Sequence, residues 1–374
     1  MGHPPKSLMQ SARRLLCLWC MLGFLAPMTV LAADDEEFDA VHHTADGYYL
    51  DFSPIGKIEL PRIFIIRSEV TGYSLRTYWT TRSALRSGEM HASLHSEEVE
   101  EDTHAEAEPD TEALIASGDH LGATLVPNDG EVVLDLSMTR HLMFALLASG
   151  ILLTIFLQLA GKYKRGIGRT SAPQGLFQNL FETLVIFVRD DIAIPNLGRD
   201  KYQRYLPYLL TAFFFILTCN LLGLVPYGAT ATSNLNITAV LAAFTFVLTQ
   251  VNGSRDHWRH VFWPPGMPVL VKFLLIPTEI MGLFIKPIAL AIRLFANLTA
   301  GHLVILSLIG MIFTFTQLFG EAVGYGVVPI SLGFTLFVMC LEILIAFIQA
   351  YIFTILSALF IGMAIADHSH SEAH

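Results

Sequence analysis

Two long apolar stretches near the C-terminus, residues 269–319 and 327–366, contain a few ionisable side chains at regular intervals. In the first stretch Glu279, Lys286 and Arg293 follow one another at seven-residue steps. Seven residues make nearly two helical turns, so these side chains fall close to one stripe, which drifts by about 20° per step. The spacing predicts a helix with one charged stripe inside an otherwise apolar segment.

Further polar residues extend this pattern in both stretches. Asn297 lies one turn beyond Arg293, and His302 follows in the same stretch. In the second stretch Glu342 and Gln349 are again seven residues apart. Both stretches therefore carry polar groups along one side of an apolar helix.

A charge inside a membrane span costs about 2.5–3.5 kcal/mol on insertion scales, so spans that only anchor a protein omit charged residues. One interpretation is that Lys286 and Arg293 reach toward the lipid headgroups and mark span ends. Apolar sequence continues for more than twenty residues beyond Arg293, which disfavours that interpretation for Arg293. We prefer the other interpretation, a polar path for ions with a fixed positive charge near its middle.

The composition is typical of an integral membrane protein. Of the 374 residues 53% are hydrophobic and only 15% are charged, and the mean hydropathy is +0.52. The net charge of −10 is unevenly distributed. Residues 33–140 contain 7 Lys and Arg against 23 Asp and Glu, whereas residues 141–374 contain 13 against 10. We therefore expect an acidic soluble segment joined to a slightly basic membrane domain.

The N-terminal residues 1–32 have the pattern of a secretory signal peptide. A positively charged start is followed by an apolar run and by small residues at a plausible cleavage point before Ala33. An uncleaved anchor helix is the alternative. We expect residues 33–140 to be exported, with short strands within residues 48–70 and 123–137 and a solvated acidic loop at 96–112. Histidines in this segment show no convincing ligand spacing, so no metal site is predicted.

The expected fold class is an all-α polytopic membrane protein with about five membrane helices, an interfacial helix, and a small N-terminal segment of mixed or disordered structure. The interfacial helix is predicted at 175–192, where apolar residues recur at helical intervals. The last two membrane helices should be long and tilted, because they exceed the thickness of a bilayer core of about 30 Å. The predicted membrane helices are 142–160, 205–225, 237–251, a short 269–285 helix broken from a long 287–318 helix, and 329–366.

Proline at 277 and 287 and Gly282 motivate the predicted break in the fourth helix. The Gly-rich sequence 321–326 is expected to form the turn before the last helix. Basic residues directly after the first span, at 162–165, place that end in the cytoplasm. The N-terminal segment is then periplasmic and the polar tail 367–374 is cytoplasmic, with residues 141–366 forming the membrane domain.

Several motifs that are typical of nucleotide-binding proteins and hydrolases do not occur in the sequence. The sequence has no G-x-x-x-x-G-K-[ST] phosphate loop, no H-E-x-x-H and no G-x-S-x-G. No cofactor is expected, and nucleic acid is not an expected partner. Besides a polar path for ions, the pattern leaves open a channel or secondary transporter that works without a rotor and has Arg293 as a substrate site, and an intramembrane enzyme.

The sequence K-P-I-A-L-A-I-R-L-F-A-N-L-T-A-G-H from Lys286, together with E-I-L-I-A-F-I-Q-A-Y-I-F from Glu342, resembles the proton-channel subunit a of F-type ATP synthases. The P-x-E sequence that ends at Glu279 and S-N-L-N-I-T at 233–238 also fit that family. The resemblance covers about residues 140–366, and its motifs occur in the family's order. The N-terminal segment resembles the extended N-terminal region of some bacterial members.

This resemblance implies a stator subunit that provides two proton half-channels beside a rotating ring of c subunits. Its implied partners are the c-ring, the subunit b stalk, the F1 sector and the lipid of a bacterial inner membrane. It implies no catalytic site in this chain. The positions that match the family's proton-translocating residues are Arg293, His302, Glu342, Gln349, Asn297 and Glu279, and Lys286, Asn234 and Asn236 are further lining candidates.

Two departures from the usual family pattern stand out. Many members have an acid where this chain has His302 and an imidazole where it has Glu342, so the two groups are exchanged here. Because either group relays a proton, the exchange predicts that the two helices are in contact at these positions. Some members also have an acid at the position of Asn234.

Overall fold

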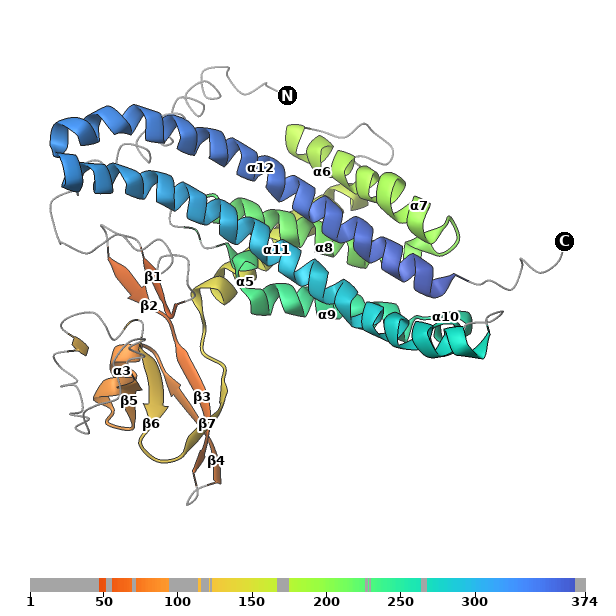
Figure 1. The fold of residues 1–374 in the computed structure, drawn as a ribbon, viewed down its shortest axis with the longest axis horizontal. Coiled ribbons are helices and arrows are strands. Elements are labelled where there is room, and N and C mark those ends of the chain that lie inside the picture. The colour runs from red at the N-terminus through yellow and green to blue at the C-terminus, as the bar shows by residue number, and fades with distance from the viewer. Residues whose placement is uncertain are drawn as a thin grey trace.

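The computed structural model describes residues 47–51, 56–68, 72–93, 114–115, 121, 123–166, 175–225, 228, 230–263 and 268–366. The predicted signal peptide (1–32), the acidic loop (96–112) and the polar tail (367–374) lie outside the described residues. The described chain forms a small β-rich part, which Figure 1 shows in orange to yellow, followed by a larger helical part that runs from yellow (α5) through green to blue.

The helical part confirms the predicted all-α membrane fold. Among the described residues, four helices are long and apolar enough to cross a membrane, and a fifth span results if α9 and α10 count as one helix pair bent by 103°. The helices are α5 (Arg140–Lys164), α8 (Tyr202–Gly223), α9 (Leu235–Val251), α10 (Arg255–Phe262), α11 (Val269–Phe319) and α12 (Glu321–Ile365).

The predicted break in the fourth helix is wrong, because α11 is continuous over 51 residues with Pro277 and Pro287 inside it. A proline removes one backbone hydrogen bond and crowds the preceding turn, which bends a helix without necessarily ending it. Figure 1 shows α11 running the length of the helical part beside α12, with its N-terminal end next to α10. The prediction that the last two helices are long is confirmed, although both begin earlier than predicted, and their tilt stays a prediction.

The predicted Gly-rich turn at 321–326 is also wrong. Gly320 alone separates α11 from α12, and its φ of 85° is a conformation that glycine adopts without strain. Gly324 instead lies in the first turns of α12 against the side chain of Thr316, where a Cβ would overlap with that threonine. Gly324 therefore serves the close approach of the two helices, whereas a Cβ at Gly326 would meet nothing within 4 Å.

Helix α8 lies at the centre of the helical core. Its apolar residues recur every three or four positions, so one broad face is buried against α5, α12 and the short helices before α8. The buried residues of that face include Leu209, Ala212, Phe213, Ile216 and Leu217. This packing fixes α12, and with it Glu342 and Gln349, relative to the rest of the bundle.

The predicted helix at 175–192 is present as α6 (Leu176–Phe187), and it continues into a π-helical turn, η3 (Val188–Ala193), and α7 (Ile194–Leu197). Gly362 of α12 lies against the carbonyl of Asn196, so α7 approaches α12 at backbone distance. Helix α10 had no counterpart among the predicted helices. Lys201 Nζ donates to the carbonyl of Ile365 at 2.8 Å, and Ser254 N donates to that of Ala364 at 2.8 Å, so both satisfy the free carbonyls at the end of α12.

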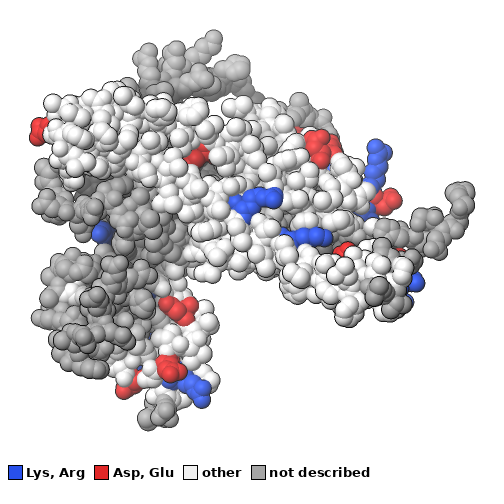
Figure 2. All heavy atoms as spheres, in the orientation of Figure 1, with Lys and Arg blue, Asp and Glu red and all other residues white. Residues whose placement is uncertain are grey.

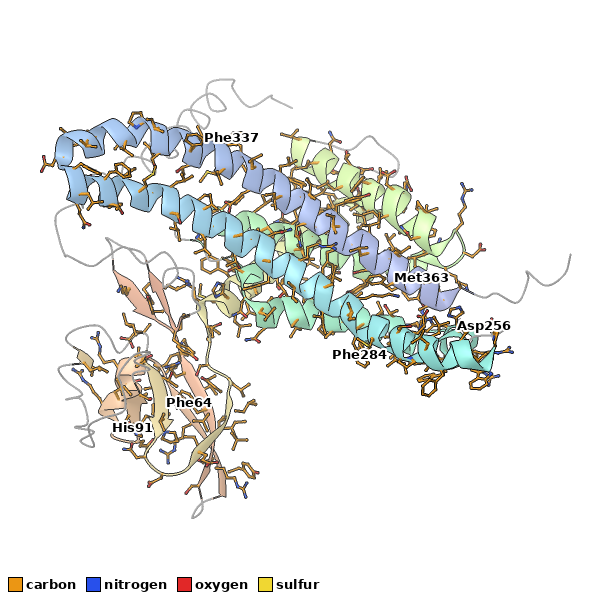
Figure 3. The ribbon with its side chains drawn as sticks, in the orientation of Figure 1. Phe64, His91, Asp256, Phe284, Phe337 and Met363 are labelled. Carbon is orange, nitrogen blue, oxygen red and sulfur yellow. The ribbon has the colours of Figure 1, made fainter. Side chains whose placement is uncertain are left out.

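The N-terminal part contains the predicted strands β1 (Tyr49–Asp51), β2 (Lys57–Glu59), β3 (Arg62–Ser68), β6 (Thr124–Pro127) and β7 (Glu131–Asp135), and also β4 (Gly72–Tyr78), α3 (Thr81–Arg86) and β5 (Met90–Ser93). All the pairs are antiparallel, and β3 lies between β4 and β7. Phe64 and Ile66 alternate with half-buried residues along β3 and form a core with α3 and β5. Figure 3 shows Phe64 among these elements.

Candidate functional site

Arg293 lies on an exposed, largely apolar face of α11. Its neighbours Ile288 and Ile292 are 55% and 51% exposed, and Arg293 has no ion-pair partner among the described residues. Figure 2 shows the surface over α11 and α12 as mostly uncharged, with isolated charged side chains in it. A permanent positive charge on an apolar face requires a partner of opposite charge when that face is in a membrane.

One turn after Arg293, a polar contact joins the two long helices. Asn297 Nδ2 donates to Gln349 Oε1 at 3.0 Å, and Gln349 is only 1% exposed. The contact fixes the register of α11 against α12 next to Arg293.

Glu342 is buried in α12 at 3% exposure, directly against the backbone of Gly301 in α11. A Cβ at position 301 would overlap with Glu342 Oε1, whereas Oε2 is buried without a hydrogen-bond partner among the described residues. The helix contact that the exchanged residues predict is therefore present. No hydrogen bond is described between Glu342 and His302. His302 instead lies within the electrostatic influence of Arg140 and His141 at the start of α5.

Polar residues that the sequence analysis did not select surround this region. His141 Nε2 and Ser233 Oγ are 3.2 Å apart, and Ser233 belongs to the 3-10 turn η4 (Ala231–Ser233). The neighbouring Thr232 donates to Asn220 Oδ1 at 2.7 Å, and Asn220 Nδ2 donates to the carbonyl of Ala346 at 3.4 Å, one turn after Glu342. We call Glu342, His302, His141, Ser233, Thr232 and Asn220 the Glu342 cluster.

Asn234 and Asn236, predicted as possible lining residues, lie at the start of α9. Asn234 is the N-cap of this helix, and its Oδ1 accepts from the amide of Asn236 at 2.8 Å. A capping side chain of this kind satisfies one of the free amides of a helix start. Asn236 is exposed. Asn234 therefore caps α9 next to the Glu342 cluster, whereas Asn236 contributes only its backbone amide to this contact.

At the other end of α11, Glu279 and Lys286 line a cavity of about 420 Å³. Lys286 Nζ lies 5.6 Å from the ring centroid of Phe360 in α12. Figure 3 shows Asp256 and Met363, two further lining residues, at this same end of the helical part. We call this space the Glu279 cavity, and its polar lining is Glu279, Lys286, Asp256, His257, His260, Thr245, Thr249 and Gln250.

The two polar regions are separated along a single helix. Glu279 and His302 are 23 residues apart in α11, which corresponds to about 35 Å along the axis at 1.5 Å per residue. Arg293 lies between them, 14 residues after Glu279 and nine before His302. The Glu342 cluster, Arg293 and the Glu279 cavity thus follow one another along the α11–α12 pair.

A polytopic membrane protein with titratable groups at two separate places and a lone arginine between them belongs to the class of ion-translocating membrane subunits. A family profile described as "ATP synthase A chain" matches residues 142–362, which is more than half of the chain. The chain therefore belongs to the ATP synthase A chain family.

Similar proteins carry the name ATP synthase subunit a. The protein from Chloroherpeton thalassium is 41% identical over 345 residues, covering 91% of this chain and 81% of the relative. One from Chlorobium phaeobacteroides is 47% identical over 65% of this chain and 72% of its own length, and one from Anaeromyxobacter is 36% identical over 92% and 74%. These relatives confirm the predicted class, a proton-translocating subunit of a bacterial ATP synthase, over a transporter that works alone or an intramembrane enzyme.

Proposed function

We propose that Arg293 separates two proton half-channels, one formed by the Glu342 cluster and the other by the Glu279 cavity. One observation supports this proposal. Arg293 is exposed, has no ion-pair partner among the described residues, and lies on the continuous helix α11 between the two polar regions. Protons reach the face of α11 from one region and leave it through the other. A carrier with an ionisable group must then move past Arg293 along that face.

The carrier is a carboxylate on each subunit of the c-ring, the partner that the family resemblance implies. Arginine does not lose its proton in proteins, so its charge is permanent. At about 4 Å and an effective dielectric constant near 20, the attraction between Arg293 and a carboxylate is on the order of 4 kcal/mol. That corresponds to about 3 pKa units of the carrier's carboxyl group, which suffices to release its proton near Arg293.

In this proposal Glu342 and His302 pass protons through the outer half-channel. Both side chains accept and donate protons; Glu342 packs against Gly301, and His302 is the next residue of α11. His141 and Ser233 extend the polar path toward the start of α5. The Asn297–Gln349 hydrogen bond holds the two helices together where the path reaches Arg293.

The inner half-channel is the Glu279 cavity. Its volume of about 420 Å³ is large enough for several water molecules, whose share of liquid volume is about 30 Å³ each. Glu279 supplies a titratable group in this space, and Lys286 supplies a second positive charge between Glu279 and Arg293. Each of these positive charges opposes the passage of a free proton from one region to the other.

The proposed orientation follows from the distribution of charge. Lys162, Lys164 and Arg165 at the end of α5 indicate a cytoplasmic end, which leaves the β-rich N-terminal part in the periplasm. With five crossings the C-terminus is cytoplasmic. The site then faces the c-ring within the inner membrane, with the subunit b stalk and the F1 sector as further partners in the complex.

The substitution Arg293→Ala tests this function directly. We expect ATP-driven proton pumping in inverted membrane vesicles to be abolished while the complex still assembles, because Arg293 has no described ion-pair or hydrogen-bonding partner in this chain that its removal would leave unsatisfied. Arg259→Ala, an exposed arginine on α10 outside the cavity lining, is the matched control and should pump normally. Full pumping by Arg293→Ala would refute the two half-channels and favour a pathway that does not pass Arg293.

A further inference from the structure

The histidines of α10 have no part in the function proposed so far. Helix α10 begins at Arg255, after the 103° bend from α9, and Ser254 caps it by accepting from the amide of His257 at 3.1 Å. His257 is half-buried and lines the Glu279 cavity, and His260 lines it from an exposed position one turn later. The helix therefore presents two imidazoles to a cavity that also contains Glu279.

His257 is held in place by several elements. Its Nε2 lies 3.4 Å from Gln250 Oε1 of α9. Its ring packs edge-on against the ring of Trp258, with the two ring centroids 5.7 Å apart. The Ser254 side chain and backbone that cap α10 also contact the end of α12, because Ser254 Oγ donates to the carbonyl of Ala366 at 3.2 Å. Three helices thus determine where this imidazole lies relative to the cavity.

The charged groups around His257 come from two elements. On α11 these are Glu279 and Lys286, and on α10 they are His260 and Asp256. Gln250 is the polar but uncharged neighbour on α9, and α12 contributes Phe360, Met363 and Ala366 to the cavity. Besides burial, the charges of Lys286 and His260 disfavour the protonated imidazole, whereas Glu279 favours it. The cavity therefore contains, together with His257, a carboxyl group that favours the protonated imidazole and cationic groups that favour loss of its proton.

We propose that His257 is the proton relay by which the Glu279 cavity releases protons to the cytoplasm, with His260 and Asp256 at its mouth. This inference rests on the inner half-channel proposed above. A protonated Glu279 gives its proton through cavity water to a neutral His257, and the resulting imidazolium gives one proton to the medium and returns to the neutral form. Imidazole suits this step because it titrates near neutral pH and uses two nitrogens, one to accept and one to donate.

The relay predicts a particular pH dependence. At a cytoplasmic pH low enough to keep His257 protonated, the residue cannot accept a proton, so flux toward the cytoplasm is slow. Because burial and the charges of Lys286 and His260 disfavour the protonated imidazole, flux should rise with the pH on that side over the range below about pH 6.5, the ordinary pKa of histidine. A variant without the imidazole should show a lower and flatter profile, because water and Glu279 alone must then carry the proton.

The test measures passive proton flux through the membrane sector of the assembled complex, in inverted vesicles stripped of F1, driven by a potassium diffusion potential. His257→Gln should lower the flux at pH 8 by about tenfold, less than a full general-base contribution because cavity water substitutes in part. The rise of its flux with pH below about pH 6.5 should flatten. Arg259→Gln, the same change on the exposed side of α10, is the matched control and should keep the wild-type profile.

A second variant separates a relay from a structural role. Gln250 lies next to His257, so the double variant Gln250→His, His257→Gln returns an imidazole to the cavity at a different backbone position. We expect this double variant to recover the rise in flux with pH. An unchanged profile in His257→Gln, or a double variant with the flat profile of the single one, would overturn the relay.

The function and the relay can fail separately. Normal ATP-driven pumping by Arg293→Ala would refute the half-channels, and the relay with them. Loss of pumping in Arg293→Ala together with a wild-type profile in His257→Gln would refute the relay alone.

Discussion

The Glu342 cluster and the Glu279 cavity contain the same kinds of ionisable side chain in different packing environments. Glu342 is 3% exposed and lies against a glycine backbone, in a contact that leaves no room for a methyl group. Glu279 is half-buried and borders an open space of about 420 Å³. The difference indicates that proton transfer in the Glu342 cluster depends on close helix packing. In the Glu279 cavity it depends on which titratable side chains contact the water inside the cavity.

The largest effect that follows from this comparison is expected for Gly301→Ala. The added Cβ would overlap with Glu342 Oε1, so the carboxyl group or the helices must move. Overpacking of this kind costs about 1–3 kcal/mol. We expect ATP-driven pumping to fall by about tenfold, because displacing a group that transfers protons by as little as about 1 Å can cost up to about 100-fold in rate.

Gly333→Ala on α12 is the matched control, because a Cβ there meets nothing within 4 Å. It should assemble and pump like the wild type. A Gly301→Ala variant that pumps as well as Gly333→Ala would show that the contact between Gly301 and Glu342 is unimportant for proton transfer.

An exchange of the two titratable groups should have an intermediate effect. Glu342→His and His302→Glu should each slow pumping, because the first removes the acid of the cluster and the second leaves His141 as its only imidazole. The double variant Glu342→His, His302→Glu keeps one acid and two imidazoles, as in the wild type, and it places the acid near Arg140 and His141. We expect the double variant to pump faster than the slower single variant. A double variant no faster than that single variant would contradict a shared role for the two groups.

The smallest effect is expected where the cavity wall, rather than a titratable group, is changed. Tyr208 Oη and Thr245 Oγ1 are 2.6 Å apart, and Thr245 lines the Glu279 cavity. Tyr208→Phe removes this hydrogen bond, which contributes about 0.5–1.5 kcal/mol to stability. Thermal unfolding of the purified complex should shift slightly, and the pumping rate should change by less than about twofold.

Tyr325→Phe, at a tyrosine that is 72% exposed on α12, provides the control for the loss of a hydroxyl group. A large loss of pumping in Tyr208→Phe alone would mean that the wall of the cavity also takes part in proton transfer. The two regions would then be less different than their packing indicates.

The sequence predicted the residues on α11 and α12 because charge inside an apolar stretch is costly and therefore conspicuous. Arg293, Glu279 and Glu342 all interrupt long apolar runs at seven-residue steps or at motif positions. The structure brings Asn297 and Gln349 into a hydrogen bond, although 52 residues separate them. For these residues helical periodicity was sufficient, because both elements are long regular helices.

The remaining site residues lacked such a signal. His141 lies at the start of an apolar run, where a polar residue is ordinary, and Asn220 is an uncharged amide whose burial depends on contacts with η4 and α12. Helix α10 has only eight residues, and its sequence around His257 reads as a charged loop. The continuity of α11 through Pro277 and Pro287 depends on tertiary packing, which outweighs the local preference of proline to end a helix.

The central claim is that the two polar regions open to opposite sides of the membrane, and cysteine labelling tests it most directly. In assembled complexes whose four native cysteines are replaced, Ser233→Cys reports on the Glu342 cluster and Thr249→Cys on the Glu279 cavity. A small thiol reagent that does not cross membranes is added to either face of oriented vesicles. The account predicts that Ser233→Cys reacts only from the periplasmic face and Thr249→Cys only from the cytoplasmic face. Reaction of both cysteines from the same face, or of either one from both faces, would contradict it.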